Sequence, residues 1–297
     1  MLIYVVLIAG SLAMAYPMAF GLMGSLCNLK QYYARPWFPI PTAPTLENYT
    51  IMFTTQFAQY ADVPRWIANT LLRIMWYVSI TSVTSILAGY VFAKMQFKGR
   101  EIAFMYLLSS MMIPGIVYWI PTFVMLARFP GVGGNDLAGQ GGSGFANTWP
   151  ALLLTGWVNA YYVFMLRQTF RSIPNDFEEA ARVDGATTIR CLKDVYLPML
   201  KPTLTVLVIF QFVHIWNDYQ WPLIVSSGNK KIWTIALGVQ RMLYIGAQAK
   251  GYPEGTGIVD YPFSFAMAVV ATIPVIVLYL ALQRHFVEGV QGFAIKG

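Results

Sequence analysis

Long apolar runs alternate with polar segments along the whole chain of 297 residues. Each run is about 20 residues long, and a helix of that length rises about 30 Å, enough to cross the hydrocarbon core of a bilayer. The pattern therefore predicts an all-α membrane protein, with one transmembrane domain over residues 1–297 and six transmembrane helices. The predicted spans are about 2–24, 71–93, 102–126, 149–166, 203–225 and 264–283.

Prolines inside these spans predict kinks. Pro17, Pro114, Pro121 and Pro274 all lie within apolar runs. Membrane helices tolerate proline where neighbouring groups satisfy the backbone carbonyl that it frees. Such kinks suit a bundle that must open and close.

The composition excludes an ordinary soluble enzyme. The chain is 57% hydrophobic and 11% charged, whereas soluble domains have about 25% charged residues. The net charge of +7 is explained by basic residues on cytoplasmic loops and near anionic lipid, so no nucleic-acid partner is expected. Cys27 and Cys191 fall at opposite faces of the predicted topology, which excludes a disulfide between them and a cysteine metal site.

The distribution of Lys and Arg predicts which loops are cytoplasmic. The short loop after the second span carries Lys94, Lys98 and Arg100, and further basic residues follow the fourth span. Basic residues gather on short cytoplasmic loops, so both segments are placed in the cytoplasm, although the bias is weak. The long outer segments are then 28–70, 128–148 and 226–262, and the glycine-rich stretch 131–144 predicts a flexible loop.

The polar segment 172–202, between the fourth and fifth spans, predicts a cytoplasmic helix–turn–helix. Asn175 is a good N-cap, and Glu178 follows three residues later, which resembles a capping box. Gly185 ends this first helix. A second helix is expected over Thr187–Tyr196, and Leu197-Pro198 is expected to end it before the fifth span.

The first of these helices has the character of a docking element. It offers the small side chains of Ala180 and Ala181, which permit close approach to a groove, and its acids can pair with a basic partner. The alternative is an amphipathic helix on the lipid surface. That role usually needs a basic polar face, whereas this helix is net acidic, so a protein partner is favoured.

The same segment resembles the EAA loop of ABC-importer permeases. The matching residues are Glu179-Ala180-Ala181, Gly185 and Val195 to Pro198, with Val195 where the family usually has Ile. The stretches Thr45 to Tyr49, Arg171 to Pro174, Trp216 to Leu223 and Gly289 to Gly297 resemble carbohydrate-importer permeases of the MalG type. The resemblance covers nearly the whole chain, and the glycine-rich stretch 131–144 departs from it as an insertion.

The resemblance implies a type I ABC importer transmembrane domain that works by alternating access in the bacterial inner membrane. A coupling helix would dock in a cleft of an ATPase, with Glu179 pairing with an arginine there, and the cytoplasmic tail 285–297 would reach the same interface. The coupling residues are then Glu178, Glu179, Ala180, Ala181, Asp184, Gly185, Lys296 and Gly297.

The resemblance also implies partners. These are a second homologous permease, two ATP-binding subunits, an extracytoplasmic substrate-binding protein and an oligosaccharide, in contact with membrane lipid. The chain has no Gly-Lys dipeptide and hence no P-loop. It is therefore expected to be no enzyme and to hold no cofactor, with ATP and Mg bound by the partner ATPase.

Polar residues inside the spans predict a substrate pathway, because such residues usually face a bundle interior or a cavity. Polar groups beside aromatic rings suit sugars, and Arg73 is the best candidate to meet an anion. The candidates are Trp157, Asn159, Tyr161, Gln211, His214, Asn217, Asp218 and Arg73. Interhelical hydrogen bonding and the interfacial aromatic belt are the alternative explanations.

Basic residues on the outer side also raise the possibility of an acidic oligosaccharide such as alginate. These outer basic residues are Arg35, Arg65, Arg73, Lys230, Lys231, Arg241 and Lys250. The nearest rival is an ABC permease for a polyol, a peptide or a phosphonate. An ion-coupled secondary transporter would need intramembrane carboxylates, and only Asp218 comes near a span. A membrane enzyme is disfavoured because no nucleophile–base or metal constellation lies in the spans.

Overall fold

The computed structural model describes residues 2–54, 61–252 and 258–294, and these are organised as helices without a β-strand among them. The α-helices are α1 (Leu2–Ser25), α2 (Leu29–Ala34), α3 (Glu47–Met52), α5 (Val63–Lys94), α6 (Arg100–Ser109), α7 (Gly115–Ala127), α8 (Trp149–Leu153), α9 (Ala160–Ser172), α10 (Asp176–Val183), α11 (Thr188–Arg190), α12 (Leu197–Asn217), α13 (Gln220–Ser226), α14 (Ile235–Ala249) and α15 (Tyr261–Ala294). Short 3₁₀ helices are η1 (Ser110–Met112) and η3 (Lys230–Ile232), and η2 (Cys191–Tyr196) is a π-helix.

The predicted all-α membrane class is confirmed. Among the described residues, 4 helical stretches are long and apolar enough to cross a bilayer: Ile3–Ser25, Val63–Lys94, Thr188–Asn217 and Tyr261–Ala281. A bent pair of helices raises the number to 5. The count of six remains a prediction.

The predicted third span, 102–126, is two helices and not one kinked helix. Arg100–Met112 and Gly115–Ala127 meet at an angle of 97°. Pro114 lies in the break, and Ile113 before it is extended, with φ −87° and ψ 118°. Proline disfavours the helical conformation in the residue that precedes it, so the break is larger than the predicted kink.

The predicted fourth span, 149–166, is interrupted. α8 ends at Leu153 and α9 begins at Ala160. Between them Gly156 has φ +78°, a left-handed conformation that glycine adopts without steric cost. α9 has 13 residues, fewer than the about 20 that span a bilayer as a single helix.

One compact unit contains residues Met1–Thr70 and Lys230–Val277. The Asn48 side chain fastens its loops, because its amide nitrogen donates to the carbonyls of Ser25 and Cys27 at 2.8 and 2.9 Å. Lys250 Nζ contacts the buried Asp260 carboxylate at 2.6 Å and donates to Asn48 Oδ1 at 2.6 Å. Lys250, counted from the sequence among the outer basic residues, is therefore neutralised within this unit.

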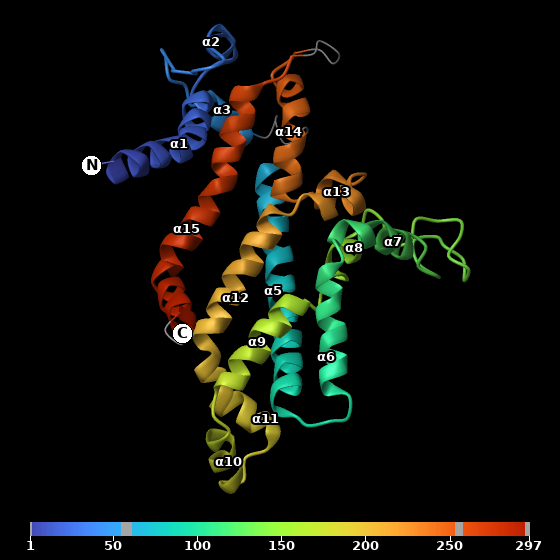
Figure 1. Cartoon of the computed structure of the whole chain (residues 1–297). Helices are drawn as coiled ribbons and strands as arrows, with labels where there is room; N and C mark the ends of the chain where they lie inside the picture. Colours follow the sequence, from blue (N-terminus) through green and yellow to red (C-terminus); the bar gives the residue numbers. More distant parts are fainter. Residues whose placement is uncertain (1, 55–60, 253–257, 295–297) are drawn as a thin grey trace. The chain divides into compact units, whose positions relative to one another are not determined.

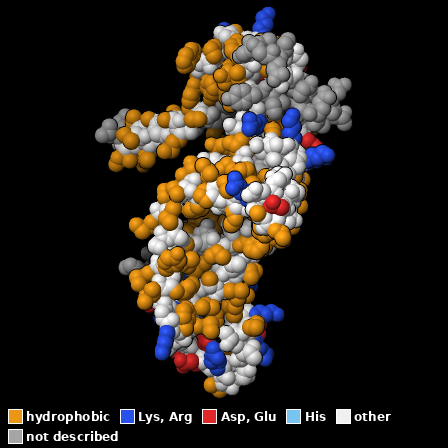
Figure 2. All heavy atoms as spheres, turned by 90° about the vertical axis from the view of Figure 1, so that its right-hand side faces the viewer, with side chains coloured by type: hydrophobic (Ala, Val, Ile, Leu, Met, Phe, Trp, Pro, Cys, Tyr) orange, Lys and Arg blue, Asp and Glu red, His pale blue; other side chains and the backbone are white. Residues whose placement is uncertain are grey.

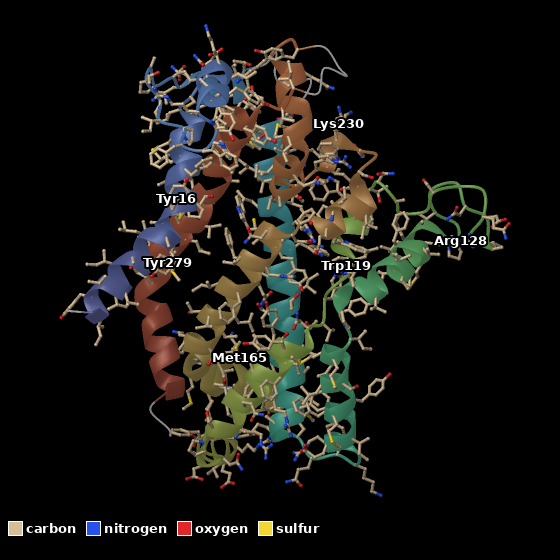
Figure 3. All side chains as sticks on the ribbon, turned by 45° about the horizontal axis from the view of Figure 1, so that its top comes forward. Tyr16, Trp119, Arg128, Met165, Lys230 and Tyr279 are labelled. Carbon is tan, nitrogen blue, oxygen red and sulfur yellow. The ribbon has the colours of Figure 1, made fainter. Side chains whose placement is uncertain are left out.

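The second unit contains residues Leu71–Asn229 and Leu278–Gly297. α5, α9 and α12 share one apolar core, with α10 and α11 at one end of these helices (Figure 1). Met165 on α9, labelled in Figure 3, packs against this core. Its buried members are Tyr90, Tyr162, Leu166, Phe170, Ile173, Tyr196, Leu200 and Leu207.

The glycine-rich stretch 131–144 follows α7, beyond the Arg128 labelled in Figure 3. It is a loop, as predicted, but it is folded on itself by hydrogen bonds. The Asn135 amide nitrogen donates to the carbonyls of Ala127 and Phe129, both at 3.0 Å, and Asn135 Oδ1 accepts from the Gly142 backbone at 2.9 Å. The structure thus gives this loop a defined conformation, and it does not test the predicted flexibility.

Candidate functional site

The hairpin, defined as residues 176–196, begins with α10. α10 ends where Gly185 adopts φ +79°. The Gly185 backbone N–H donates to Arg182 O at 3.0 Å, and the Ala186 N–H donates to Ala181 O at 2.9 Å. These are the two bonds of a Schellman motif. The prediction that Gly185 ends the helix is confirmed.

The predicted capping box at the start of α10 is wrong. Asn175 is the N-cap residue, but its side chain makes no capping hydrogen bond. Its Oδ1 instead accepts from Lys94 Nζ at 2.7 Å. Glu178, the second half of the expected box, bonds to two tyrosines. Tertiary contacts have replaced the local cap.

The second helix of the hairpin does not end at Leu197-Pro198 as predicted. α11 continues through the π-helix η2 into α12, so that Thr188–Asn217 is one helical stretch. Pro198 lies just after η2, where the hydrogen-bond pattern is that of a π-helix and not of an α-helix. The hairpin is joined to α12 as one helical stretch.

The outward surface of the hairpin carries the predicted docking residues. Glu179, Ala180, Asp184 and Gly185 are exposed, and Ala181 is half-buried. Apolar side chains accompany them: Phe177, Val183 and Ile189 are all exposed, Val183 at 87%. Figure 2 shows charged side chains gathered at the end of the second unit where α10 and α11 lie. Acids, small residues and exposed apolar groups together form a surface suited to a protein partner.

Glu178 is turned inward, unlike its neighbour Glu179. Its side chain is 13% exposed. Its Oε2 accepts from the Tyr196 hydroxyl at 2.6 Å, and its Oε1 accepts from the Tyr90 hydroxyl at 3.2 Å. Arg182, one turn along α10, reaches Oε1 at 2.6 Å. The carboxylate therefore joins α10 to α5 and to the end of η2.

These contacts act on the ionisation of Glu178. Burial by itself raises the pKa of the Glu178 carboxyl, but hydrogen bonds from Tyr196, Arg182 and Tyr90 outweigh burial and hold the pKa below its usual value. The group is therefore an anion at neutral pH. A charged acceptor makes each of these hydrogen bonds stronger than one between neutral groups.

The two remaining coupling candidates, Lys296 and Gly297, lie outside the described residues. The helix α15 continues to Ala294, so it covers most of the tail predicted at 285–297.

Arg73, the predicted anion-binding residue, is already paired. Its Nη2 contacts Asp218 Oδ2 at 2.6 Å, and the two side chains are 6% and 14% exposed. Asp218 lies at the C-terminal end of α12, and its Oδ1 also accepts from the Trp221 backbone N–H at 3.2 Å. A buried pair of this kind is neutral overall, so Arg73 does not offer a free positive charge to an anion.

The other pathway candidates are divided between buried and exposed positions. Gln211 is buried on α12, whereas His214 and Asn217 on the same helix are exposed. Trp157 and Tyr161 are also exposed, at 37% and 43%.

Local contacts hold several of these groups in place. Asn159 is half-buried and caps α9, because its Oδ1 accepts from the Tyr161 and Tyr162 backbone N–H groups. The Trp157 ring lies against Trp76 of α5, with centroids 6.4 Å apart, and the His214 ring lies 6.5 Å from that of Tyr77. Arg73 and Asp218 are joined through their side chains, and Asn159 is joined to Tyr161 by a side chain-to-backbone hydrogen bond. Pathway lining remains a prediction.

Several residues of these sites have no marker in the sequence pattern. Tyr90, Tyr77 and Trp76 are aromatic residues in an apolar span, where packing is the ordinary interpretation. Lys94 has a charge that predicts the end of that span and the side of the membrane on which it lies, but not a contact with Asn175. Tyr196 lies inside the EAA-like stretch, which is the one signal that could have marked it.

With this geometry established, comparison with known proteins decides the family. The sequence profile of the family described as "Binding-protein-dependent transport system inner membrane component" matches residues 85–292. The chain belongs to this family. The permease is therefore a multi-pass component of the inner membrane and is not itself an ATPase. Among the described residues, the permease has no group of three His, Cys, Asp or Glu side chains that could hold a metal ion.

Several relatives are named as sugar-transport permeases. The permease is 27% identical to the diacetylchitobiose uptake system permease protein NgcG of Streptomyces coelicolor, over 97% of this chain and 86% of that protein. It is 27% identical to the arabinooligosaccharides transport system permease protein AraQ of Halalkalibacterium halodurans, over 86% and 81%. It is 30% identical to the lactose transport system permease protein LacG of Rhizobium radiobacter, over 80% and 77%.

A solved structure shares the fold. It is a chain of a bacterial ABC transporter involved in the import of the acidic polysaccharide alginate. The match has a TM-score of 0.77 and 21% sequence identity, and it covers 96% of the permease and 95% of that chain. The predicted transmembrane fold of an ABC importer is supported at this level.

Proposed function

We propose that the permease is one of two transmembrane subunits of an ATP-driven oligosaccharide importer that works by alternating access. In this proposal a homologous second permease, two ATP-binding subunits and an extracytoplasmic binding protein complete the assembly. The permease contributes six crossings, the fourth of which is built from the short helices α8 and α9. The coupling helix is α10.

The observation that carries the proposal is the exposed face of α10. Glu179 and Ala180 lie on the outward surface of the hairpin, while Glu178 fastens the inward surface to α5 and η2. A partner that docks on the outward surface would thus act on an element already tied to the transmembrane helices.

Replacement of Glu179 tests this proposal. Glu179→Ala is expected to uncouple uptake from ATP hydrolysis, because it leaves a basic group of the ATPase unpaired at a loss of about 2–5 kcal/mol. The measurement is ATP-driven uptake into proteoliposomes that contain the whole transporter. Glu47→Ala, an exposed acid on α3, is the matched control and should transport normally. Full uptake by Glu179→Ala would defeat the proposal.

The cargo class rests on the relatives and on the site. Three relatives are named for the transport of arabinooligosaccharides, diacetylchitobiose or lactose. Two aromatic and two polar candidates are exposed in the same unit: Trp157, Tyr161, His214 and Asn217. Aromatic rings and polar groups suit the faces and hydroxyls of a sugar. We therefore infer a neutral or acidic oligosaccharide.

An acidic oligosaccharide such as an alginate fragment has support from the fold match, but Arg73 cannot supply its recognition while paired with Asp218. A phosphorylated polyol is the second candidate. The permease is 26% identical to the sn-glycerol-3-phosphate transport system permease protein UgpE of Brucella abortus, over 96% of this chain and 94% of that protein.

A panel of loaded binding proteins separates these cargoes. ATP hydrolysis by the purified transporter is measured with arabinotriose, diacetylchitobiose, an alginate trisaccharide and sn-glycerol-3-phosphate. We expect the strongest stimulation from one of the saccharides. Stimulation by sn-glycerol-3-phosphate alone would contradict the oligosaccharide assignment, and equal stimulation by neutral and acidic saccharides would contradict an acidic specificity.

A further inference from the structure

We propose that Glu178 is the positioning residue that transmits the movement of α10 to α5 and α12, and that it does so through the hydroxyls of Tyr90 and Tyr196. This inference rests on the proposed function, and it assigns Glu178 a role different from that of Glu179. Glu179 faces outward toward a partner, whereas Glu178 faces the core of its own chain.

The first support is that the Glu178 carboxylate bonds to residues on separate elements. Tyr90 is on α5, and Tyr196 is the last residue of η2, directly before α12. Arg182, the other partner, is on α10 itself and therefore links no second element. The two tyrosine hydroxyls are the side-chain contacts by which Glu178 can displace other helices.

The second support is that both tyrosine rings are fixed. Tyr90 and Tyr196 are buried, and with Phe170 of α9 they form an edge-to-face trio with centroids 5.5–5.7 Å apart. Packed rings transmit a displacement instead of absorbing it, because a protein interior has little free volume. Movement of the carboxylate is thus passed to α5, α9 and α12.

The third support is the π-helix between the hairpin and α12. π-turns are rare and occur mainly at functional sites. The Gly185 turn, α11 and η2 form the covalent route from α10 to α12. The hydrogen bond from Tyr196 to Glu178 bypasses them, because it joins the first turn of α10 directly to the last residue of η2.

Lys94 fastens the start of the same hairpin. Its Nζ donates to Ile173 O and to Asn175 Oδ1, both at 2.7 Å, and lies 5.3 Å from the centre of the Tyr196 ring. The entry to α10 is thereby tied to α5. Lys94 and Glu178 therefore both tie α10 to the transmembrane helices.

The test measures whether ATP binding by the partner ATPase, transmitted through the hairpin, changes the accessibility of the far end of α12. Asn217→Cys introduces an exposed thiol at that end, and the native Cys27 and Cys191 are buried. The whole transporter in nanodiscs is compared without nucleotide and after trapping with ATP and vanadate, at equal amounts of trapped nucleotide. Asn217→Cys is labelled with a methanethiosulfonate reagent in both states. The readout is the ratio of the faster labelling rate of the parent protein's two states to the slower one, and the same two states are compared in each variant.

Tyr196→Phe and Glu178→Gln are each expected to reduce this ratio roughly tenfold, which corresponds to about 1.4 kcal/mol of coupling. Tyr162→Phe is the matched control: it removes a hydroxyl from the same buried core, and that hydroxyl is not among the groups bonded to Glu178. Its ratio should equal that of the parent protein. The double variant Tyr196→Phe with Glu178→Gln should lose no more than Glu178→Gln alone.

Parent-like ratios in Tyr196→Phe and Glu178→Gln would overturn the relay. Loss of vanadate trapping in these variants would also overturn the relay, since the Tyr196 hydroxyl and the Glu178 carboxylate would then serve docking of the ATPase. An equal fall of the labelling ratio in Tyr162→Phe would contradict the relay as well, because the effect would then come from general packing of the core. If the parent itself trapped no nucleotide in the presence of the ATPase, the proposed function would fail, and that result is distinct from the other three.

Discussion

At the scale of single residues, charge is neutralised within the chain more often than the sequence suggests. Arg73 and Lys250 were both counted as outer cations, yet each contacts a carboxylate at 2.6 Å. Glu178 and Glu179 are adjacent in sequence but differ in role, because one is bonded inward and the other is exposed. A one-dimensional pattern gives residue types and spacing, and it cannot show which charges will find partners far along the chain.

The buried pair of Arg73 and Asp218 predicts that Arg73→Met alone destabilises the fold more than Arg73→Met combined with Asp218→Asn. Arg73→Met alone leaves the Asp218 carboxylate without its cation, at a cost of about 3–5 kcal/mol. Combining it with Asp218→Asn removes the stranded charge and should restore most of the lost stability. Thermal unfolding of the purified variants in detergent is the measurement. A double variant as unstable as Arg73→Met would contradict this account of the pair.

The depressed pKa of Glu178 predicts that the hairpin weakens in acid. A carboxyl whose folded pKa lies below its unfolded value, about 4.3, stabilises the fold above that value and loses the contribution as pH falls through the folded pKa. Amide exchange over residues 176–190, corrected for intrinsic rates, should therefore rise at low pH. In Glu178→Gln this part of the pH dependence should disappear. An unchanged profile in that variant would assign the effect to the other carboxyls.

At the scale of elements, the apolar pattern predicts where helices lie better than how they are joined. Four of the predicted spans have helical counterparts that pass the length and hydropathy test. The 97° break at Pro114 and the interruption at Gly156 are not visible in the hydrophobic pattern. Pro114 indicated the position of the first change but not its size, whereas the interruption at Gly156 was not predicted.

The hairpin shows the same distinction. Gly185 ends α10 as predicted, because a left-handed residue is needed there and glycine adopts it freely. The expected capping box and the expected stop at Pro198 are wrong, because long-range contacts of Lys94, Tyr90 and Tyr196 compete with local signals. No local pattern could predict contacts formed with residues almost 90 positions away.

The turn at Gly185 predicts a graded response to substitution. Gly185→Ala must hold a β-carbon at φ +79°, at a cost of about 1–2 kcal/mol. No heavy atom lies within 4 Å of the added carbon, so the cost is backbone strain and not a clash. Gly185→Asn is the matched control, since asparagine accepts this conformation more readily. Amide exchange of α10 should be fastest in the alanine variant, and equal effects would contradict the explanation.

At the scale of the whole molecule, the permease leaves large apolar surfaces for other molecules. The described apolar window of α1 has 0% of its residues buried, which fits contact with lipid or with a second permease. The polar hairpin presents a different surface, with acids, small residues and exposed apolar side chains. The assembly needs both kinds of contact, and the account depends most on the second, where the energy of ATP must enter.

Site-directed cross-linking measures that contact most directly. Ala180→Cys lies on the exposed face of α10, and Leu137→Cys, 91% exposed on the predicted outer loop, is its control. In membranes that contain the whole transporter, a short thiol-to-amine reagent should join Ala180→Cys to the ATPase subunit and leave Leu137→Cys unjoined to it. If Ala180→Cys reacted with a membrane-impermeant reagent from the outside, or never joined the ATPase, the central claim would be contradicted.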